Sequence, residues 1–400
     1  MGDSTTGKRR WLRWVLRIAL TLVVVLGGYV GYVAIRAAQP VTLPAPTGPY
    51  QVGRSLVEWT DGTRTDPLAP QPGKPRELSV WLWYPGDPGP GARHAPYTPG
   101  AWAGLHVGGP ATLGETSFTE VAGHSFADVP VSAGRFPVVV LEPGMGLAAP
   151  QYTTLAENLA SHGYLVAGVT PTYSANLTVL KGQTVSATEA GKPAATDTEN
   201  EHAGEAQAAG DRLVAVWADD ARFAATQVAA LDTSGRFAGH INAGTVVYSG
   251  HSFGGAAALE ACRTDPRCAG AADLDGTQYG AVVSAGLAKP MMLIGGENSC
   301  ITGSCRPADA GEQASRDVAR TMLAAGTGSA WCHQITGAEH FNFSDYGSYY
   351  LAAPIRSQVP LGPIDGAEAL TTTNAYLTAF AGHVTQGRPE PRLSGEACAR

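Results

Sequence analysis

The stretch that decides the fold is AGTVVYSGHSFGGAAALEAC, which occupies residues 243–262. It runs from a β-rich segment through a G-x-S-x-G motif, Gly250 to Gly254, directly into an Ala-rich helical segment. A serine on such a sharp strand-to-helix turn needs small residues two positions before and after it, and Gly250 and Gly254 meet that need. The order of strand, Ser252 and helix predicts an α/β fold with the Ser252 hydroxyl exposed over one edge of a sheet.

Apolar runs bounded by Gly, Pro or Asn recur along the chain, and they predict buried parallel strands. These runs occupy residues 78–84, 136–141, 165–169, 245–248, 271–274 and 291–294, and the strand-like WCHQIT follows at 331–336. Helical periodicity predicts helices at 152–161, 211–231, 254–262, 313–325 and 367–383. Alternating strands and helices indicate one domain over residues 50–400, with a mainly parallel central sheet flanked by helices.

Two segments fit neither pattern. Residues 85–134 are rich in Gly, Pro and His, and residues 181–210 are polar and contain no aromatic side chain. The second segment follows a strand that should end at the active edge of the sheet, so it is either a lid over the site or a mobile surface insertion.

The amino-terminal segment has the features of a membrane helix. Residues 18–35 form an uncharged run of 18 residues, long enough to span about 27 Å as a helix. Five basic residues precede the run and Arg36 follows it, so residues 1–17 are expected to form a basic cytoplasmic tail with the bulk of the chain outside. We expect residues 18–36 to be a single-pass anchor in the cell membrane, followed by a proline-rich linker at 37–49; the alternative is a cleaved signal and a secreted protein.

Charge and cysteine usage limit the function classes. Charged residues make up 15% of the chain, and without residues 1–40 the remainder holds 21 basic and 33 acidic residues, a net charge of about −12. This composition argues against a nucleic-acid partner. The six cysteines suggest disulfides in an exported chain: Cys262 with Cys268 and Cys300 with Cys305 would close small loops and leave Cys332 with Cys398, although fifteen pairings are possible. No CxxC or histidine cluster indicates a metal site.

A serine hydroxyl becomes an effective nucleophile only when a base takes its proton, and the base needs an acid to orient it. Downstream of Ser252, His340 follows a strand-like run, whereas His333 falls inside that run and His383 in the last predicted helix. We therefore expect His340 to be the base. The acid is expected to be Asp275, at the end of its strand, with Asp273 and Glu297 as substitutes.

Two backbone amides would have to stabilise the oxyanion that forms when the hydroxyl attacks a carbonyl group. Phe253, directly after the nucleophile, is expected to supply the first amide. The stretch FPVVVLEPGMG at 136–146 ends in glycines that allow close backbone approach, and Met145 is the expected second donor. The alternative for this stretch is an ordinary glycine-rich turn.

Taken together, these motifs resemble the α/β-hydrolases similar to platelet-activating factor acetylhydrolase, of the secreted type and its bacterial relatives. The likeness rests on PRELSVWLWYP (75–85), FPVVVLEPGMG, LASHGYLVAGV (159–169), GHSFGG (250–255), LDG (274–276) and HFNFSD (340–345), and it spans about residues 50–350. The resemblance implies Ser252 as nucleophile, Asp275 as acid, His340 as base and Met145 and Phe253 as oxyanion donors. Family members often carry Ser-His before the oxyanion glycine, where this chain has Glu142 and Pro143.

The sequence therefore predicts a serine esterase or lipase that needs no metal or organic cofactor. Its expected partners are an ester or phospholipid substrate and the membrane, and the protein is expected to be a monomer. The alternatives are a lipase or cutinase-like hydrolase of neutral esters or polyesters, and a non-catalytic exported binding module on the same fold.

Overall fold

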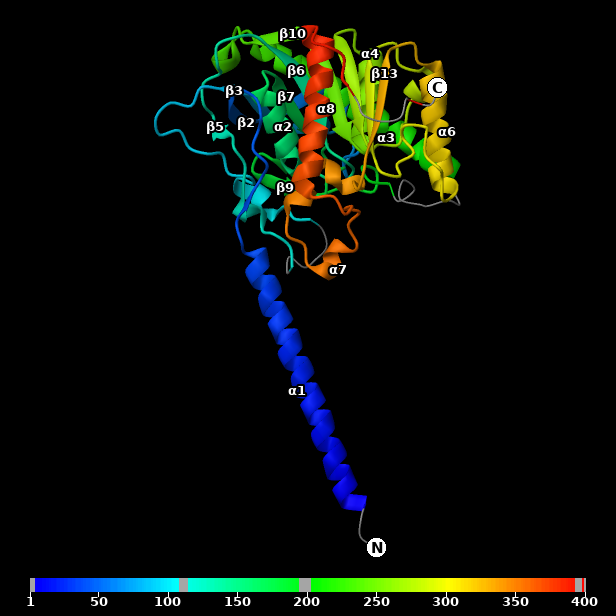
Figure 1. The fold of residues 1–400 in the computed structure, drawn as a ribbon. Coiled ribbons are helices and arrows are strands. Elements are labelled where there is room, and N and C mark those ends of the chain that lie inside the picture. The colour runs from blue at the N-terminus through cyan, green and yellow to red at the C-terminus, as the bar shows by residue number, and fades with distance from the viewer. Residues whose placement is uncertain (1–3, 108–113, 194–202, 393–397, 399–400) are drawn as a thin grey trace.

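The computed structural model describes residues 4–107, 114–193, 203–392 and 398, and it shows a globular α/β body with one long helix projecting from it (Figure 1). The main sheet of the described part contains β2 (Gln51–Thr65), β3 (Pro75–Gly86), β5 (Phe126–Ala127), β6 (Phe136–Glu142), β7 (Leu165–Thr170), β10 (Ile241–His251), β11 (Cys268–Leu274), β12 (Met291–Gly296) and β13 (Ala330–Ile335). The helices are α1 (Ser4–Ala37), α2 (Thr153–Ser161), α3 (Ala203–Leu231), α4 (Phe253–Thr264), α5 (Val282–Ala285), α6 (Ala310–Ala325), α7 (Ala353–Arg356) and α8 (Gly366–Gln386).

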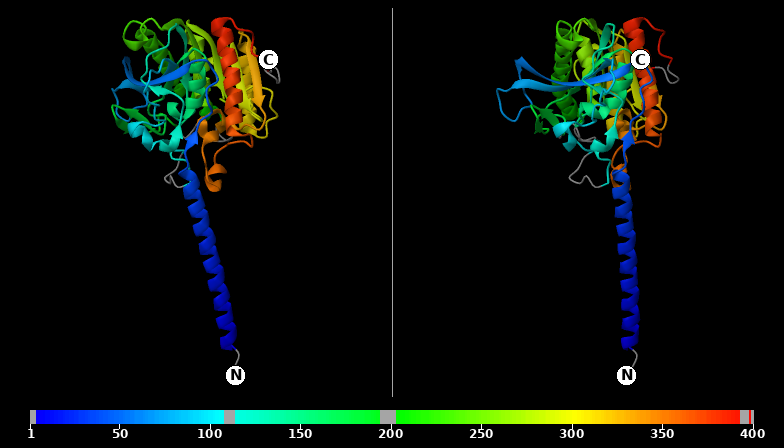
Figure 2. Two further views of the ribbon diagram at one scale, coloured as in Figure 1. Left: turned by 60° about the vertical axis from the view of Figure 1, so that its left-hand side comes forward. Right: turned by 90° about the vertical axis from the view of Figure 1, so that its left-hand side faces the viewer.

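The strands lie in the order β13-β12-β11-β10-β6-β7-β3-β2-β5. All neighbours from β13 to β7 are parallel, which confirms the mainly parallel sheet, and the chain has the α/β-hydrolase fold. One strand prediction was wrong in direction: β3 is buried as expected, but it runs antiparallel to both β7 and β2. The reason is the long β2–β3 hairpin, which enters the sheet before the parallel part begins and projects sideways from the body in Figure 2.

Helices cover both faces of the sheet, which explains why its strands are apolar throughout. On one face α2 and α8 bury Leu155, Leu370 and Phe380 against strand residues such as Val139 and Leu141. On the other face α3 and α4 pack against the intervening residues of the same strand, Val138 and Val140, and α6 adds Met322 and Leu323 to the same core cluster. In Figure 1, α8 lies in front of the sheet and α3 and α4 lie behind it.

The segment at 85–134 contains little regular structure but contributes to the core. Tyr97, Trp102 and Phe118 are buried, and Trp102 packs edge-on against Trp81 of β3. The polar segment at 181–210 begins in a small hairpin, in which β9 (Gln183–Val185) pairs with the preceding β8 (Thr178–Leu180), and α3 starts earlier than expected, at Ala203. Residues 194–202, the centre of the expected lid, lie outside the described residues.

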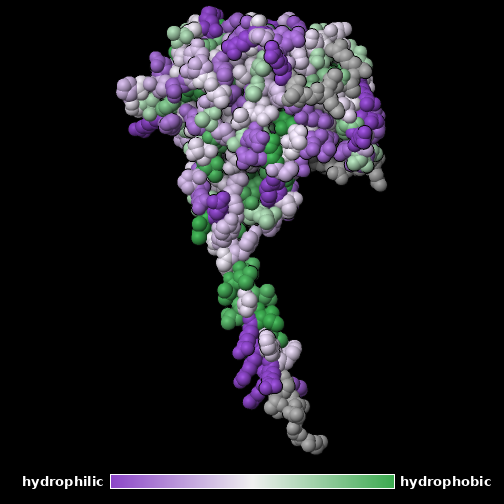
Figure 3. Space-filling model, viewed as in Figure 1, coloured by the Kyte–Doolittle hydropathy of each residue, from purple (hydrophilic) through white to green (hydrophobic). Residues whose placement is uncertain are grey.

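Helix α1 is long and apolar enough, by length and composition, to cross a membrane. Figure 3 shows a hydrophilic stretch toward its amino-terminal end and an apolar stretch toward the domain. The helix does not lead into a free spacer, because β1 (Val41–Thr42) pairs with β4 (Val121–Ala122) and Leu43 is buried. The proline-rich linker therefore packs against the domain, and the domain lies close to the end of α1.

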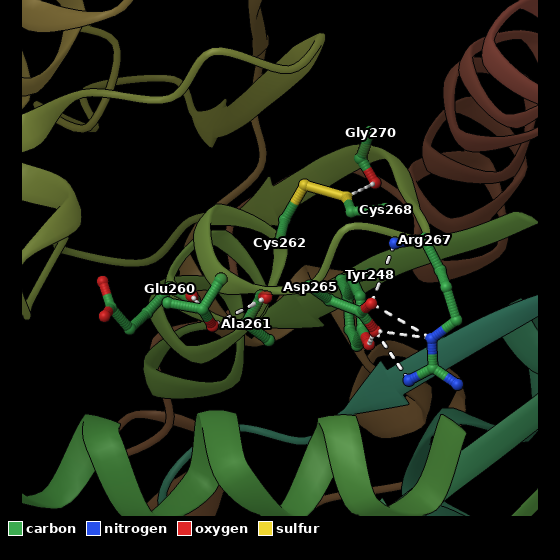
Figure 4. The surroundings of a disulfide bond; sticks show 9 residues. Tyr248, Glu260, Ala261, Cys262, Asp265, Arg267, Cys268 and Gly270 are labelled. Carbon is green, nitrogen blue, oxygen red and sulfur yellow. Dashed lines mark hydrogen bonds and ion pairs between the residues drawn. A yellow bond between two sulfur atoms is a disulfide. The ribbon is translucent and has the colours of Figure 1, made fainter. Parts of the chain in front are cut away.

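Three disulfides join Cys262 to Cys268, Cys300 to Cys305 and Cys332 to Cys398. The structure thus selects the pairing that sequence spacing favoured. Figure 4 shows the first of them, which links the end of α4 to the start of β11 beside the Asp265–Arg267 ion pair. Disulfides together with an apolar amino-terminal helix suggest an extracytoplasmic protein.

Candidate active site

Ser252 lies on a strained turn between β10 and α4. Its φ is 56° and its ψ −127°, a conformation that L-residues rarely adopt. The turn is possible only because its neighbours are small: a Cβ on Gly250 would lie 2.2 Å from the Gly254 carbonyl oxygen, and one on Gly254 would lie 2.4 Å from that of Pro143. The local sequence therefore forces the hydroxyl out of the strand direction, at the amino-terminal end of α4.

His340 meets Ser252 from the loop that follows β13. Its Nε2 lies 2.9 Å from Ser252 Oγ, and its Nδ1 lies 2.6 Å from Asp275 Oδ2. These two contacts allow the imidazole to carry its proton on Nδ1, facing the carboxylate, and to present an unprotonated Nε2 to the hydroxyl. The structure thus brings together the three residues that were expected to form the proton-transfer path.

Asp275 follows the last residue of β11, where the backbone turns with φ 59°. The Gly296 amide donates to its other oxygen, Oδ1, at 2.9 Å, so both carboxylate oxygens have a fixed partner. Burial on its own would raise the pKa of Asp275, but hydrogen bonds from His340, Ser299 and Gly296 hold this pKa below its ordinary value. The side chain therefore stays an anion beside His340.

The other candidate acids lie elsewhere. Asp273 is fully buried behind the turn, where it accepts hydrogen bonds from the Gly276 amide and the Gln278 side chain. Burial raises the pKa of Asp273 well above its ordinary value, which favours a neutral side chain. Glu297 is exposed and accepts from the Gly337 amide at 2.8 Å.

His333 and His383 lie in β13 and α8 as expected, and neither lines the cavity beside Ser252.

The loop that carries Met145 lies directly against the turn that carries Ser252. A Cβ on Gly144 would lie 3.2 Å from Ser252 Cβ, which shows how closely the two backbones approach. Met145 and Phe253 both line the cavity that also contains Ser252 and His340. The two expected amide donors thus flank the same space.

Glu142 and Pro143 stand where members of the resembling family often carry Ser-His. Glu142 does not line the cavity beside Ser252. It is fully enclosed at the end of β6, and neither carboxylate oxygen has a hydrogen-bond partner among the described residues. Burial and the nearby Asp220 raise the pKa of Glu142 well above its ordinary value, which favours the neutral carboxyl group.

A cavity of about 420 Å³ opens beside Ser252. One part of its wall is aromatic, formed by Phe253 and Tyr279, whose ring centroids lie 5.4 Å apart. Much of the rest is polar and comes from the loops after β11 and β12 and from the start of α6: Thr277, Asn298, Ser299, Glu312 and Ser315. The size suits a compact ligand group rather than a long extended one. No residue of 181–193 or 203–210 lines it.

Two buried residues beside the site, His251 and Tyr152, were not predicted from the sequence. His251, the residue before the nucleophile, donates or accepts through both ring nitrogens: Nδ1 lies 2.7 Å from Tyr152 Oη and Nε2 lies 2.8 Å from the His340 carbonyl oxygen. Burial, and to a smaller extent the nearby His340, lower the pKa of His251 to about 3. The signal available in the sequence was a histidine inside GHSFGG itself, which the search for a base downstream of Ser252 did not consider.

The structure describes no group of three or more His, Cys, Asp or Glu side chains that could hold a metal ion within residues 4–107, 114–193, 203–392 and 398. The arrangement around Ser252 brings a hydroxyl, an imidazole, a carboxylate and an amide-bearing loop together. Groups of these kinds can carry out acyl transfer.

Comparison with known proteins shows that the chain is similar in structure to an esterase. A solved structure described as a ferulic acid esterase from Streptomyces cinnamoneus superimposes with a TM-score of 0.70 and 28% sequence identity, over 91% of this chain and 98% of that one. No family model matches the chain. No curated protein matches it either. The structural neighbour supports ester hydrolysis as the general class of reaction.

Proposed function

We propose that this protein is a serine carboxylic ester hydrolase in which Ser252, His340 and Asp275 act as nucleophile, base and orienting acid. The observation that carries the proposal is the hydrogen-bond path from Asp275 Oδ2 to His340 Nδ1, at 2.6 Å, and from His340 Nε2 to Ser252 Oγ, at 2.9 Å. The strained turn under Ser252 and the esterase neighbour support it independently.

The reaction would proceed through an acyl-enzyme. Ser252 Oγ attacks the ester carbonyl while its proton passes to His340 Nε2, and the carbonyl electrons move to the oxygen, which the Met145 and Phe253 amides stabilise. Collapse of this intermediate breaks the bond to the alcohol, which leaves with the proton from His340. Water then attacks the acyl group with His340 again as base, and the acid leaves as Ser252 recovers its proton.

For the substrate we propose an ester with a compact acyl group on a lipid, in the manner of platelet-activating factor acetylhydrolase. The cavity beside Ser252 has a volume of about 420 Å³, enough for a short acyl chain. The end of α1 and the segment after His340 lie at the same end of the domain (Figure 1). Arg36 of α1 stacks over the Tyr350 ring at 5.3 Å, so a membrane anchored through α1 would lie close to this end.

A second candidate substrate is an ester of an aromatic acid. The aromatic part of the cavity wall, Phe253 and Tyr279, could pack against a planar acyl group, and the structural neighbour is described as a ferulic acid esterase. Lipases and cutinase-like hydrolases of neutral esters remain the alternatives that the motif itself suggests.

The test is an ester panel assayed on the full-length protein in detergent, with Ser252→Ala as the matched control. We expect release of acetate from a short-acyl phospholipid to exceed release of long-chain fatty acid, and Ser252→Ala to abolish both. Faster hydrolysis of a feruloyl ester would favour the second candidate. Equal turnover by wild type and Ser252→Ala would support a binding module on this fold instead.

We also propose that α1 stays attached as a single-pass anchor with the hydrolase domain outside the cytoplasm. Its basic residues precede the apolar stretch, as expected for a cytoplasmic amino terminus. Membrane fractionation with mass determination of the intact protein tests this. Recovery of a soluble chain that starts near residue 38 would show that the segment is a cleaved signal.

A further inference from the structure

Behind the site, an uninterrupted series of hydrogen bonds joins the loop that carries Met145 to the backbone of His340. The Gly144 amide donates to Tyr152 Oη at 2.9 Å, Tyr152 Oη lies 2.7 Å from His251 Nδ1, and His251 Nε2 lies 2.8 Å from the His340 carbonyl oxygen. The path starts one residue before Met145 and ends on the residue expected to be the base.

The chemistry of its two ends sets the direction of every bond in this path. An amide can only donate, so Tyr152 Oη accepts from Gly144 and is left to donate its own proton to His251 Nδ1. A carbonyl oxygen can only accept, so His251 must carry its proton on Nε2 and donate it to His340. Each hydrogen bond therefore has one direction, and the neutral form of His251 with its proton on Nε2 satisfies all of them.

The surroundings keep these side chains in place. Tyr152 and His251 are each 1% exposed, and a Cβ on Gly144 would lie 3.0 Å from His251 Nδ1. The His251 ring lies against the His340 ring, with centroids 4.5 Å apart, and is stacked on Phe343 at 6.0 Å. The buried groups have little freedom to find other partners.

The electrostatics agree with this geometry. The titratable groups that face His251 are His340, Asp275 and Tyr152. Two more, Tyr346 and Asp345, lie beyond Tyr152. With the pKa of His251 lowered to about 3, the ring stays neutral over the working range of an esterase. A neutral ring adds no positive charge next to His340 at the moment when His340 takes up the serine proton.

We infer that Tyr152 and His251 are positioning residues, which hold the Met145 loop and the His340 backbone in register on opposite sides of Ser252. The inference rests on the proposed function, since it assigns these residues a part in the same reaction. Neither side chain lines the cavity, so they act through Gly144 and His340 and do not touch the substrate. Small displacements of groups around a nucleophile can cost about 10²-fold in rate, which is the scale of effect expected here.

The experiment compares four single variants of the full-length protein, and the double variant Tyr152→Phe/His251→Met, on a chromogenic short-chain ester. Tyr152→Phe removes the hydroxyl, His251→Met removes both ring bonds, and His251→Gln restores an acceptor and a donor. Tyr84→Phe is the matched control, because Tyr84 is equally buried and its hydroxyl donates to the Val129 carbonyl oxygen, away from the cavity.

We expect Tyr152→Phe and His251→Met to lower kcat roughly 10- to 100-fold with little change in KM. The double variant should lose no more than His251→Met alone, since both changes interrupt one path. His251→Gln should recover most of kcat, and Tyr84→Phe should lower the melting temperature without lowering kcat. Wild-type kcat in Tyr152→Phe, or equal losses in His251→Gln and His251→Met, would overturn the inference.

A second readout does not depend on turnover. Nitrogen-15 NMR of the His251 ring should show the neutral Nε2–H form from pH 8 down to pH 4. Titration of this ring near its ordinary pKa of about 6.5, or a proton on Nδ1, would contradict the path. If Ser252→Ala left hydrolysis intact, the proposed function would fail, whereas this measurement would still decide whether the path exists.

Discussion

Replacing Asp275 with asparagine should leave the site folded but move the ring proton of His340 to the wrong nitrogen. The wild-type carboxylate accepts from the Gly296 amide through Oδ1 and faces His340 Nδ1 through Oδ2. In Asp275→Asn the amide of Gly296 still requires an acceptor, so the asparagine oxygen takes that place and its NH₂ group faces His340. An NH₂ group donates, so Nδ1 must accept and the ring proton moves to Nε2, where it blocks removal of the Ser252 proton.

The size of the effect follows from this change of tautomer. Substitutions of the same kind in serine hydrolases lower kcat about 10⁴-fold, which corresponds to about 5.5 kcal/mol of transition-state stabilisation. Binding contacts at the cavity are untouched, so KM should change little. Asp273→Asn is the matched control: Asp273 accepts from the Gly276 amide and the Gln278 side chain and does not contact His340, so losing one of its two acceptor oxygens should cost stability, about 1 kcal/mol, rather than turnover.

The assay is steady-state hydrolysis of a chromogenic short-chain ester, with thermal unfolding measured in parallel. We expect kcat to fall about 10⁴-fold in Asp275→Asn and less than about tenfold in Asp273→Asn. This expectation would be refuted by a larger loss in Asp273→Asn, or by an Asp275→Asn variant that is folded and keeps more than about a tenth of wild-type kcat.

Three further predictions address the elbow, the buried histidine and a disulfide. Gly254→Ala should abolish activity, because its Cβ would lie 2.4 Å from the Pro143 carbonyl oxygen; a soluble variant with wild-type kcat would contradict this. Since the folded pKa of His251 is lowered to about 3, its contribution to stability is present above about pH 6.5 and lost as pH falls toward 3. Urea unfolding should therefore show wild type weakening relative to His251→Gln by up to about 1.4 kcal/mol per pH unit between pH 6 and 4, and parallel curves would argue against it. Replacing Cys332 and Cys398 by serine should lower the free energy of unfolding by up to about 4 kcal/mol, because the bond spans 66 residues of sequence, and should leave kcat unchanged.

Much of the fold could be predicted because the parallel strands are buried on both faces and are therefore apolar throughout. The runs that became β6, β7, β10, β11 and β12 all carried this signal. β2 did not, since RSLVEWTDGTRT alternates apolar and polar residues around a charged turn, and the direction of β3 depends on that hairpin. The segment at 85–134 folds through contacts with distant residues, such as Tyr97 with Tyr349, and no local periodicity reveals them.

The proximity of the expected site residues could be predicted because each follows a strand at the same edge of the sheet, where the chain must bring them together. Ser252 follows β10, Asp275 follows β11 and His340 follows β13. The contacts of Tyr152 and His251 could not be predicted in this way. Tyr152 lies on a short turn before α2, 99 residues from His251, and only the folded backbone places its hydroxyl between Gly144 and the ring.

The identity of the nucleophile is the central claim, and covalent trapping tests it most directly. The full-length protein would be treated with a fluorophosphonate, digested and analysed by mass spectrometry, with Ser252→Ala treated in parallel. We predict a single adduct on the peptide that contains Ser252, complete loss of ester hydrolysis when it forms, and no adduct in Ser252→Ala. A wild-type protein that hydrolyses esters but is labelled elsewhere, or is not labelled at all, would contradict the account.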